Sequence, residues 1–458
     1  MSKVATEIFK AYDIRGIVGK SLTDETVELI GKALGTEARR RGGKTITIGR
    51  DGRLSGPAFA IALARGIQST GINVIDIGMV ATPMVYFAAH HLETGSGVMI
   101  TGSHNPPDYN GIKMVIQGDT LALDAIQVLL RRINDGDFET GAGTYQTADV
   151  TDAYIARIVG DAKLKRPIKV VVDCGNGAPG AFAPKLFRAM GCEVIELFCE
   201  VDGNFPNHHP DPARPENLQD VIRTLRETDA ELGLAFDGDG DRLGVVTKDG
   251  EIIYPDRQLM LFAADVLSRV PGGEVIFDVK SSRNLFKWVR DHGGRPTMYK
   301  TGHSLLKLKM KETGAPIAGE MSGHIFFKER WYGFDDALYC GARLLEIVTA
   351  FADSSAPLKA LPNAISTPEL NWALKEGEPH ALVDRIRDTA TFEGATEVIT
   401  IDGVRVEYPD GFGLARASNT TPVIVLRFEA ETEAALERIK ADFRRVLSAA
   451  KPGVPLPF

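Results

Sequence analysis

Short runs of β-branched and other apolar residues alternate with stretches of helical periodicity along most of this chain. The runs predict strands at residues 45–48, 73–77, 97–100, 169–172, 193–197 and 274–277. Amphipathic stretches between them predict helices, for example at residues 57–68, 179–190 and 218–227. This alternation indicates α/β units with largely parallel sheets.

A coarse internal repeat is visible in this pattern. A predicted strand ends in a polar turn and leads into a helix three times, at residues 48–51, 172–175 and 277–280. Each time, a later apolar run ends in a second polar motif. We therefore expect three similar mixed α/β domains, each of which contributes one loop to a shared site beyond the carboxyl ends of its strands.

The last part of the chain has a different pattern. Strands are predicted at residues 396–406 and 422–429, with a polar loop at 416–421 between them and a helix at 430–450. Residues 357–368 contain three prolines and are interpreted as a linker. We therefore expect a smaller C-terminal α+β domain, and we place the four domains at residues 1–149, 150–251, 252–362 and 363–458.

The composition narrows the class of protein. The 458 residues are 44% hydrophobic and 25% charged, which is ordinary for a globular protein. The net charge of −8 argues against a general nucleic-acid surface, and no apolar stretch is long enough to span a bilayer. The four cysteines form no Cys-x-x-Cys pair and the N-terminus has no signal-peptide pattern, so we expect a cytoplasmic protein.

The most distinctive motif is Asp237-Gly-Asp239-Gly-Asp241-Arg242, which follows an apolar run. Like charges this close repel one another, so the cluster is costly unless a cation binds it. Oxygen ligands in a tight glycine-containing loop suit Mg²⁺ or Ca²⁺ rather than zinc. An EF-hand is excluded because Arg242 and Lys248 occupy the positions that need a glycine and a carboxylate. A phosphatase loop with Asp237 as phosphoryl acceptor and a solvated acidic turn are the open alternatives.

A second motif contains a candidate nucleophile. Ser103 and His104 follow an apolar run in a turn bounded by glycine and proline, where a serine can expose its hydroxyl to a ligand. His104 could act as a base, and Lys113 is a candidate cation or proton carrier. An ordinary turn serine and a solvated lysine explain the same residues without any function.

Two further loops carry groups suited to binding a sugar phosphate. Glu320 and Ser322 offer an acceptor and a hydroxyl for sugar hydroxyls, and His324 could exchange protons, although a tight polar turn is an equal alternative. The other loop offers a guanidinium fork, hydroxyls and backbone N–H groups that suit a phosphate, with an exposed hairpin-like loop as the alternative. Its residues are Arg416, Ser418, Asn419, Thr420 and Thr421.

Two other patterns are interpreted as structural. Residues 175–180 match the Gly-x-Gly-x-x-Gly pattern of dinucleotide-binding proteins, so an NAD-dependent dehydrogenase is an alternative. Pro179 removes an N–H group that would hold a pyrophosphate and favours a helix start instead. His208-His209 resembles a zinc-binding pair, but nearby prolines and the lack of a third neighbouring ligand favour a structured loop.

Taken together and in this order, the motifs resemble the α-D-phosphohexomutase family, and most closely its bacterial phosphomannomutase/phosphoglucomutase branch, over essentially the whole chain. Residues 10–16, which include Tyr12 and Arg15, are similar to the family's N-terminal signature. Residues 101–106 are similar to its phosphoserine loop. The resemblance implies four domains around a central cleft.

The resemblance also implies roles for individual residues. Mg²⁺ would be bound by Asp237, Asp239 and Asp241 and by a phosphate on Ser103. The implied catalytic residues are Ser103, His104, Lys113, Arg242 and His324, with Lys113 preferred over His324 as the general acid or base. The implied substrate-binding residues are Tyr12, Arg15, Lys280, His303, Glu320, Ser322, Arg416, Ser418, Asn419 and Thr420.

The implied reaction is the reversible conversion of hexose 1-phosphate and hexose 6-phosphate through a phosphoserine and a hexose 1,6-bisphosphate. Glucose 1,6-bisphosphate would serve as an activator. Met321 favours glucose and mannose phosphates, since phosphoglucosamine mutases tend to carry Gln at this position. A phosphoglucosamine mutase, a metal-dependent sugar phosphatase and a non-enzymatic sugar-phosphate-binding protein are the alternatives. We expect a monomer without nucleic-acid or membrane partners.

Overall fold

The first part of the chain forms a seven-stranded mixed sheet in the computed structural model, which describes residues 4–419 and 421–458. The strand order is β1-β5-β4-β2-β3-β7, with β6 beside β5. β2 is parallel to β3 and β4, whereas β5 is antiparallel to β1 and β4. The strands are β1 (Ile14–Ile17), β2 (Thr45–Arg50), β3 (Asn73–Met79), β4 (Gly97–Ile100), β5 (Tyr109–Ile116), β6 (Asp119–Thr120) and β7 (Tyr145–Thr147), and the helices are α1 (Asp24–Arg40), α2 (Gly56–Gln68), α3 (Thr82–His91) and α4 (Asp124–Asp135).

The second sheet has the order β12-β11-β10-β8-β9, with β8 parallel to both β9 and β10. Its strands are β8 (Lys169–Asp173), β9 (Glu193–Leu197), β10 (Leu232–Phe236), β11 (Leu243–Thr247) and β12 (Ile252–Ile253). The helices of this region are α5 (Thr151–Asp161), α6 (Ala183–Met190) and α7 (Gln219–Glu227).

The third sheet has the order β14-β13-β15-β16. Its strands are β13 (Glu274–Asp278), β14 (Arg295–Tyr299), β15 (Ile317–Gly319) and β16 (Ile325–Phe327). The helices are α8 (Pro255–Arg269), α9 (Asn284–Asp291), α10 (His303–Thr313), α11 (Ala337–Val348) and α12 (Ala356–Lys359).

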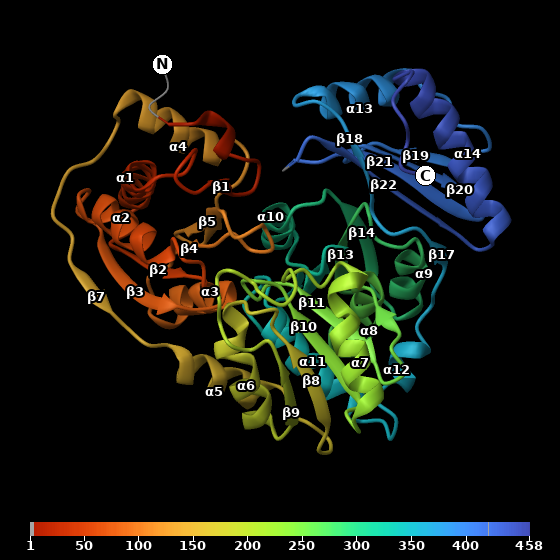
Figure 1. Cartoon of the computed structure of the whole chain (residues 1–458), viewed down its shortest axis with the longest axis horizontal. Helices are drawn as coiled ribbons and strands as arrows, with labels where there is room; N and C mark the ends of the chain where they lie inside the picture. Colours follow the sequence, from red (N-terminus) through yellow and green to blue (C-terminus); the bar gives the residue numbers. More distant parts are fainter. Residues whose placement is uncertain (1–3, 420) are drawn as a thin grey trace.

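The C-terminal sheet is antiparallel, with β22 at its centre between β17 or β18 on one side and β21 on the other. Its strands are β17 (Ile365–Ser366), β18 (Leu370–Ala373), β19 (Glu397–Ile399), β20 (Val404–Tyr408), β21 (Gly411–Ala417) and β22 (Val423–Ala430). Two helices pack on it, α13 (Glu378–Thr389) and α14 (Glu433–Ala450). Figure 1 shows the four sheets following one another around the molecule, from the red N-terminal sheet to the blue C-terminal one.

The first three sheets share the feature that positions the polar motifs. In each, a strand with a parallel neighbour leads through a motif loop into an antiparallel partner: β4 into β5, β10 into β11 and β15 into β16. Each motif loop therefore emerges at the carboxyl end of a parallel strand, where α/β sheets bind ligands. This repeated arrangement confirms the prediction of three similar α/β domains and a different C-terminal one.

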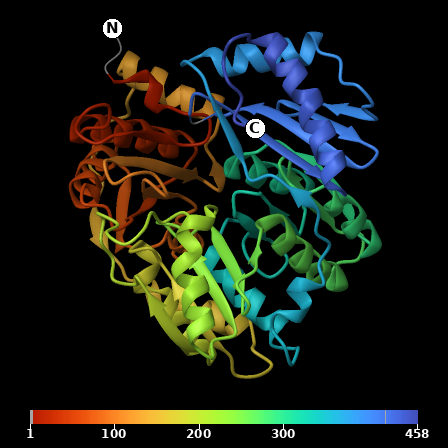
Figure 2. The same cartoon turned by 45° about the vertical axis from the view of Figure 1, so that its right-hand side comes forward.

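The hydrophobic core is divided unequally. A large cluster joins residues of the first three sheets, from Ile75 in the first to Phe327 in the third. The C-terminal sheet has a separate cluster around Trp372 and Phe443. In Figures 1 and 2 the blue C-terminal part lies beside the green third part. A smaller cluster of Val279, Phe412 and Leu414 joins the C-terminal sheet to the third part of the chain, so the two also share buried contacts.

The structure departs from the sequence-based prediction in several elements. The sheets are mixed rather than largely parallel, because each motif loop turns the chain into an antiparallel strand. The strand predicted at 396–406 is a hairpin of β19 and β20, since Gly403 adopts a φ of 83° in the turn between them. The predicted linker at 357–368 contains α12 and β17, and the predicted polar loop at 416–421 begins inside β21.

None of the helices in residues 4–419 and 421–458 has the length and apolar character of a membrane span.

Candidate active site

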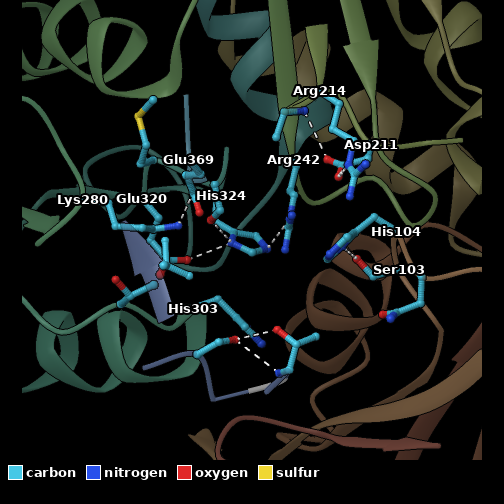
Figure 3. Close-up of a pocket in the computed structure, with 18 of the residues that line it drawn as sticks. Ser103, His104, Asp211, Arg214, Arg242, Lys280, His303, Glu320, His324 and Glu369 are labelled. Atoms are coloured by element: carbon cyan, nitrogen blue, oxygen red, sulfur yellow. Dashed lines mark hydrogen bonds and ion pairs between the residues drawn. The ribbon is translucent and has the colours of Figure 1, made fainter. Parts of the chain in front are cut away.

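A cleft of about 1060 Å³ is lined by residues that follow strands of all four sheets. Figure 3 shows how side chains from the different sheets point into this cleft. The cleft brings together nearly all of the substrate-binding and catalytic residues that the sequence predicts. Those that line it are Tyr12, Arg15, Ser103, His104, Lys113, Arg242, Lys280, His303, Glu320, Ser322, His324, Arg416, Ser418 and Asn419. Thr420 lies outside the described residues.

Ser103 is held in a strained turn directly after β4. Its backbone has a φ of 48°, in the left-handed region that a serine rarely adopts, and Thr101 Oγ1 accepts its backbone N–H at 2.8 Å. The Ser103 hydroxyl donates to Asp237 Oδ2 at 3.0 Å, and His104 Nδ1 lies 3.1 Å from Ser103 Oγ. Burial, reinforced by Arg242 and Arg15, lowers the pKa of His104 well below its usual value, so this imidazole is neutral.

The three aspartates converge in the loop after β10. They are fully buried, and one carboxylate oxygen from each lies within 4.8 Å of the others. Asp237 Oδ1 accepts the backbone N–H groups of Gly240, Asp241 and Arg242, each at 3.1 Å. The loop turns at Gly240, which has a φ of 78° and packs so closely on Pro179 that a Cβ would lie 2.8 Å from its ring.

Lys113, on β5, supplies a positive charge to this cluster. Its Nζ donates to Asp239 Oδ2 at 2.8 Å and to Asp241 Oδ2 at 2.5 Å. Although burial opposes the charge, these two carboxylates raise the pKa of Lys113 well above its usual value. Burial, followed by repulsion from Asp239 and Asp241, raises the pKa of Asp237. One lysine therefore does not balance three buried carboxylates.

The aspartate cluster fits a hard divalent cation. Asp239 Oδ1 is buried and accepts no hydrogen bond from any described residue, so a ligand atom is available. Its other oxygen accepts from Thr82 and Lys113, which orient the carboxylate. Carboxylate oxygens are the ligands that Mg²⁺ prefers, and such an ion would offset the repulsion among the three carboxylates that raises the pKa of Asp237.

His324 connects the aspartate loop to the loop after β15. Its Nδ1 lies 2.8 Å from Glu320 Oε2, and its Nε2 lies 3.2 Å from Asp241 Oδ1 and 3.3 Å from Arg242 Nε. Burial opposes protonation, but Asp241 and Glu320 raise the pKa of His324 to about 9. A protonated His324 donates from Nδ1 to Glu320 and forms an ion pair with Asp241, and thereby ties the two loops together. Ser322 Oγ is 3.1 Å from the same Nδ1.

Other cleft residues make contacts between sheets. Lys280 Nζ is paired with Glu369 Oε1 at 2.7 Å, and Tyr12 donates its hydroxyl to the carbonyl of Thr301 at 2.7 Å. Arg416, at the end of β21, donates from Nε to Asp402 Oδ2 at 3.0 Å. Further contacts of the predicted residues are Asn419 Nδ2 to the Tyr12 hydroxyl, Arg15 to Asp13 and Asn105, and His303 Nδ1 at 3.5 Å from Asp335 Oδ2.

Several residues of the cleft have no counterpart in the motifs. Glu369 pairs with Lys280 although it follows the predicted linker directly. Asp211 and Arg214 form an ion pair, which lies above His104 and Ser103 in the view of Figure 3. Asp335 is fully buried and does not itself line the cleft; it binds Lys307 Nζ at 2.9 Å and faces His303, which does line it. Isolated charged residues outside a glycine-rich motif give no signal in a single sequence.

The glycine-rich segment at 175–180 and the His208-His209 pair, both interpreted above as structural, contact neighbouring segments of the chain. The N–H of Ala178 donates to the carbonyl of Gly238 at 2.9 Å, so the glycine-rich segment supports the aspartate loop. A short 3₁₀ helix, η2 (Ala178–Ala181), contains Pro179. His208 Nε2 lies 3.0 Å from Asp173 Oδ2. All four cysteines are free.

Sequence models of known families match almost the entire chain. They are described as phosphoglucomutase/phosphomannomutase α/β/α domains I, II and III and C-terminal domain, and match residues 6–140, 152–250, 254–365 and 369–446. The chain belongs to the phosphoglucomutase/phosphomannomutase family. The resemblance inferred from the motifs is therefore confirmed, and so is its consequence that the chain is an isomerase of the phosphohexomutase type.

Individual relatives agree with this assignment along the full length. The chain is 61% identical to a phosphoglucomutase of Neisseria meningitidis, with 98% of each chain covered. It is 56% identical to a phosphomannomutase/phosphoglucomutase of Pseudomonas aeruginosa, with 98% of this chain and 97% of the relative covered. Its structure matches the crystal structure of a phosphoglucomutase/phosphomannomutase family protein from Burkholderia thailandensis with a TM-score of 0.95, at 62% identity and with 99% and 100% of the two chains covered.

Proposed function

We propose that this chain interconverts the 1-phosphates and 6-phosphates of glucose and mannose through a phosphate carried on Ser103. The observation that carries the proposal is the contact between the hydroxyl of Ser103, which lines the cleft, and the buried carboxylate of Asp237. The choice of sugars is supported by the names of the relatives, which include both phosphoglucomutase and phosphomannomutase. Met321, beside Glu320 in the cleft, favours the same two sugars.

The transfer itself exchanges one phosphorus–oxygen bond for another. The bond between phosphorus and Ser103 Oγ breaks while a bond to the free sugar hydroxyl forms, which gives a hexose 1,6-bisphosphate. After this intermediate reverses its orientation, its other phosphate returns to Ser103. Asp237, Asp239 and Asp241 would hold Mg²⁺, which when bound neutralises charge on the phosphoryl group.

The residues around the cleft would orient the sugar phosphate. Arg416 offers a guanidinium fork, and the neighbouring side chains of Ser418 and Asn419 offer further donors for the phosphate that does not react. Thr420 is assigned to the same role from the sequence alone. Glu320 and Ser322 would bind the sugar hydroxyls. Arg15, Lys280 and His303 line the same cleft and add positive charge or donors around the substrate. Because separate groups bind the phosphate and the sugar hydroxyls, either phosphate of the bisphosphate can occupy the site at Arg416.

Two proton movements accompany the transfer. The attacking sugar hydroxyl loses its proton, and Ser103 Oγ gains negative charge as the phosphoryl group leaves. Lys113 is the proposed acid–base residue, and its raised pKa means that it enters as a proton donor. His324 is the second candidate, and the neutral His104, 3.1 Å from Ser103 Oγ, can accept a proton. Arg242 adds positive charge beside His324.

The proposal extends to the setting of the enzyme. Action in the cytoplasm is supported by the four free cysteines, which suit a reducing compartment. A monomer is proposed because one chain supplies residues to every side of the cleft. Glucose 1,6-bisphosphate is the proposed activator, since it would phosphorylate Ser103 directly.

A mutase assay tests the proposal. The purified chain is incubated with glucose 1-phosphate or mannose 1-phosphate, Mg²⁺ and a trace of glucose 1,6-bisphosphate, and formation of both 6-phosphates is expected. Release of inorganic phosphate alone would instead favour a phosphatase, and turnover of glucosamine 1-phosphate alone would favour a phosphoglucosamine mutase.

Mass spectrometry of the protein tests the role of Ser103. After incubation with glucose 1,6-bisphosphate, we expect one phosphoryl group on Ser103 and none on a Ser103→Ala variant, which should also lack turnover. Ser69→Ala is the matched control, because Ser69 lies in the same domain and only caps a helix end through the carbonyl of Gly66. Undiminished labelling of Ser103→Ala would refute the assignment.

A further inference from the structure

Arg53 is a fully buried residue that lies against the loop carrying Ser103 but does not line the cleft. Its Nη2 donates to the carbonyls of Ser103 at 2.8 Å and Asn105 at 2.7 Å. Its Nη1 donates to the carbonyls of Pro106 at 2.6 Å and Tyr109 at 2.9 Å. One guanidinium thus binds three carbonyls of the loop between β4 and β5 and the carbonyl of Tyr109, the first residue of β5.

Asp51 completes the arrangement from the other side of the loop. Its Oδ2 accepts from Thr101 Oγ1 at 2.7 Å, from the N–H of Gly102 at 3.1 Å and from Arg53 Nε at 3.3 Å. Its Oδ1 accepts the backbone N–H of Arg53 at 2.9 Å. All five guanidinium N–H donors of Arg53 are therefore used by Asp51 and the loop carbonyls.

The position of this pair explains how the strained backbone of Ser103 is maintained. A serine with a φ of 48° keeps that conformation only where its surroundings impose it. Arg53 binds the Ser103 carbonyl, and the same carbonyl oxygen would lie 2.4 Å from a Cβ at residue 238. The Ser103 backbone is thus fixed between Arg53 and the aspartate loop.

The second domain closes over Arg53. The ring of Phe205 lies 5.1 Å from the guanidinium carbon, and a Cβ at residue 203 would lie 2.9 Å from Arg53 Cα. On the loop side, a Cβ at residue 102 would lie 2.3 Å from Arg53 Nε. The guanidinium therefore has little room to shift, and the loop that it holds has little room to shift with it.

We propose that Arg53 is a positioning residue for phosphoryl transfer, which sets the direction of Ser103 Oγ relative to the aspartate cluster by holding the carbonyls of its loop. The inference rests on the proposed function, because it concerns the same transfer step. Arg53 acts through the backbone and never touches the substrate. Its loss should therefore impair the transfer and leave substrate binding nearly unchanged, because misplacement of a reacting group by about 1 Å can cost about a hundredfold in rate.

The test compares two buried arginines. Arg53→Lys keeps the charge but supplies three donors without the planar fork. Arg343→Lys is the matched control, since Arg343 is also fully buried, does not line the cleft, and donates to Asp265 and Tyr339. For both variants, the midpoint of thermal unfolding, kcat, KM and the single-turnover rate of Ser103 phosphorylation by glucose 1,6-bisphosphate are measured.

We expect both variants to unfold at lower temperature, because each loses buried hydrogen bonds. Only Arg53→Lys should lose kcat and phosphorylation rate, by about a hundredfold, with KM within threefold of the native value. A native kcat in folded Arg53→Lys would overturn the inference, as would an equal loss of kcat in Arg343→Lys.

A second variant keeps the inference testable if Arg53→Lys fails to fold. Phe205→Leu removes the ring from above the guanidinium without touching the serine loop. A severalfold fall in kcat at unchanged KM is expected, and an unchanged kcat would overturn the inference. Failure of the proposed function is recognised separately, because the native chain would then show neither mutase turnover nor phosphorylation of Ser103.

Discussion

The two sides of the cleft differ in how tightly their functional side chains are held. On one side, Ser103 is 2% exposed and the three aspartates are fully buried, each in contact with groups from more than one sheet or loop. On the other side, the residues after β21 reach the first domain through a contact of Asn419 with the Tyr12 hydroxyl. The aspartate loop follows Phe236, which belongs to the core cluster shared by the first three sheets, whereas most buried apolar residues of the C-terminal sheet form a separate cluster.

The two sides serve two steps that differ in how much displacement of their groups they tolerate: phosphoryl transfer and binding of the second phosphate. Phosphoryl transfer depends on the alignment of reacting atoms, so rigid burial of Ser103 and the aspartates serves it. Binding the second phosphate needs charge and donors but must accept either end of the sugar. The residues after β21 contact the first domain at Tyr12 rather than at Ser103 or the aspartates, so changes there should leave the reacting groups in place. Variants on the two sides should therefore affect different kinetic constants.

The largest effect is expected from Asp239→Asn. This change removes charge from the cluster, so kcat should fall on the order of 10²- to 10³-fold, the range for loss of one preorganised electrostatic group. The fold should persist, because Asp239 belongs to the site rather than the hydrophobic core. Steady-state kinetics over a range of Mg²⁺ concentrations measures the loss.

A thermal-unfolding experiment gives a readout of this variant that is independent of activity. Addition of Mg²⁺ should raise the unfolding temperature of the native chain, because a ligand that binds the folded state stabilises it, but not that of Asp239→Asn. Asp220→Asn, at a surface pair with Arg223, is the control and should behave like the native chain. Normal turnover of Asp239→Asn at low Mg²⁺ would refute the metal assignment.

A smaller effect, on KM rather than on kcat, is expected from Arg416→Lys. Lysine cannot reproduce the guanidinium fork, so we expect KM for glucose 1-phosphate to rise about tenfold while kcat stays within about threefold. Arg438→Lys, at an exposed pair with Asp410 in the same domain, is the control. If kcat collapsed while KM stayed unchanged, the C-terminal loop would take part in the transfer itself and the comparison would fail.

The smallest effect is expected from the contact across the cleft. Asn419→Ala removes one hydrogen bond between the two sides, worth about 1 kcal/mol, so KM should rise up to about fivefold. Tyr12→Phe removes this bond and also the one from the Tyr12 hydroxyl to the carbonyl of Thr301, so it should be the more affected single variant. The double variant should be no worse than the more affected single variant, because both changes remove the same bond. Additive effects in this double-mutant cycle would show that the two residues act independently.

Much of the fold and many site residues could be predicted because their signals are local. The runs at 97–100 and 193–197 have the same bounds as β4 and β9. The aspartates share one loop because alternating glycines allow the chain to turn there, and Gly240 adopts a positive φ. Predictions failed where a short-range signal was interrupted, as at Gly403, which divides a predicted strand into a hairpin.

Contacts between distant segments could not be predicted in this way. The position of Lys113 on β5 follows from the sequence, but its bond to Asp239, 126 residues away, depends on how two domains pack. The pairing of Lys280 with Glu369 and the bonds of Arg53 to the serine loop are of the same kind. In none of these contacts do the two interacting residues belong to the same sequence motif.

The sequence by itself determined the α/β repeat, the distinct C-terminal domain and the motifs that identify the family, because strand periodicity and glycine turns are properties of neighbouring residues. The tertiary structure decided which charges are balanced and how firmly each group is held. It placed one lysine between two buried carboxylates, and it used Arg53 to hold a strained serine. The physical reason is that burial and charge pairing arise only when surfaces from separate domains meet.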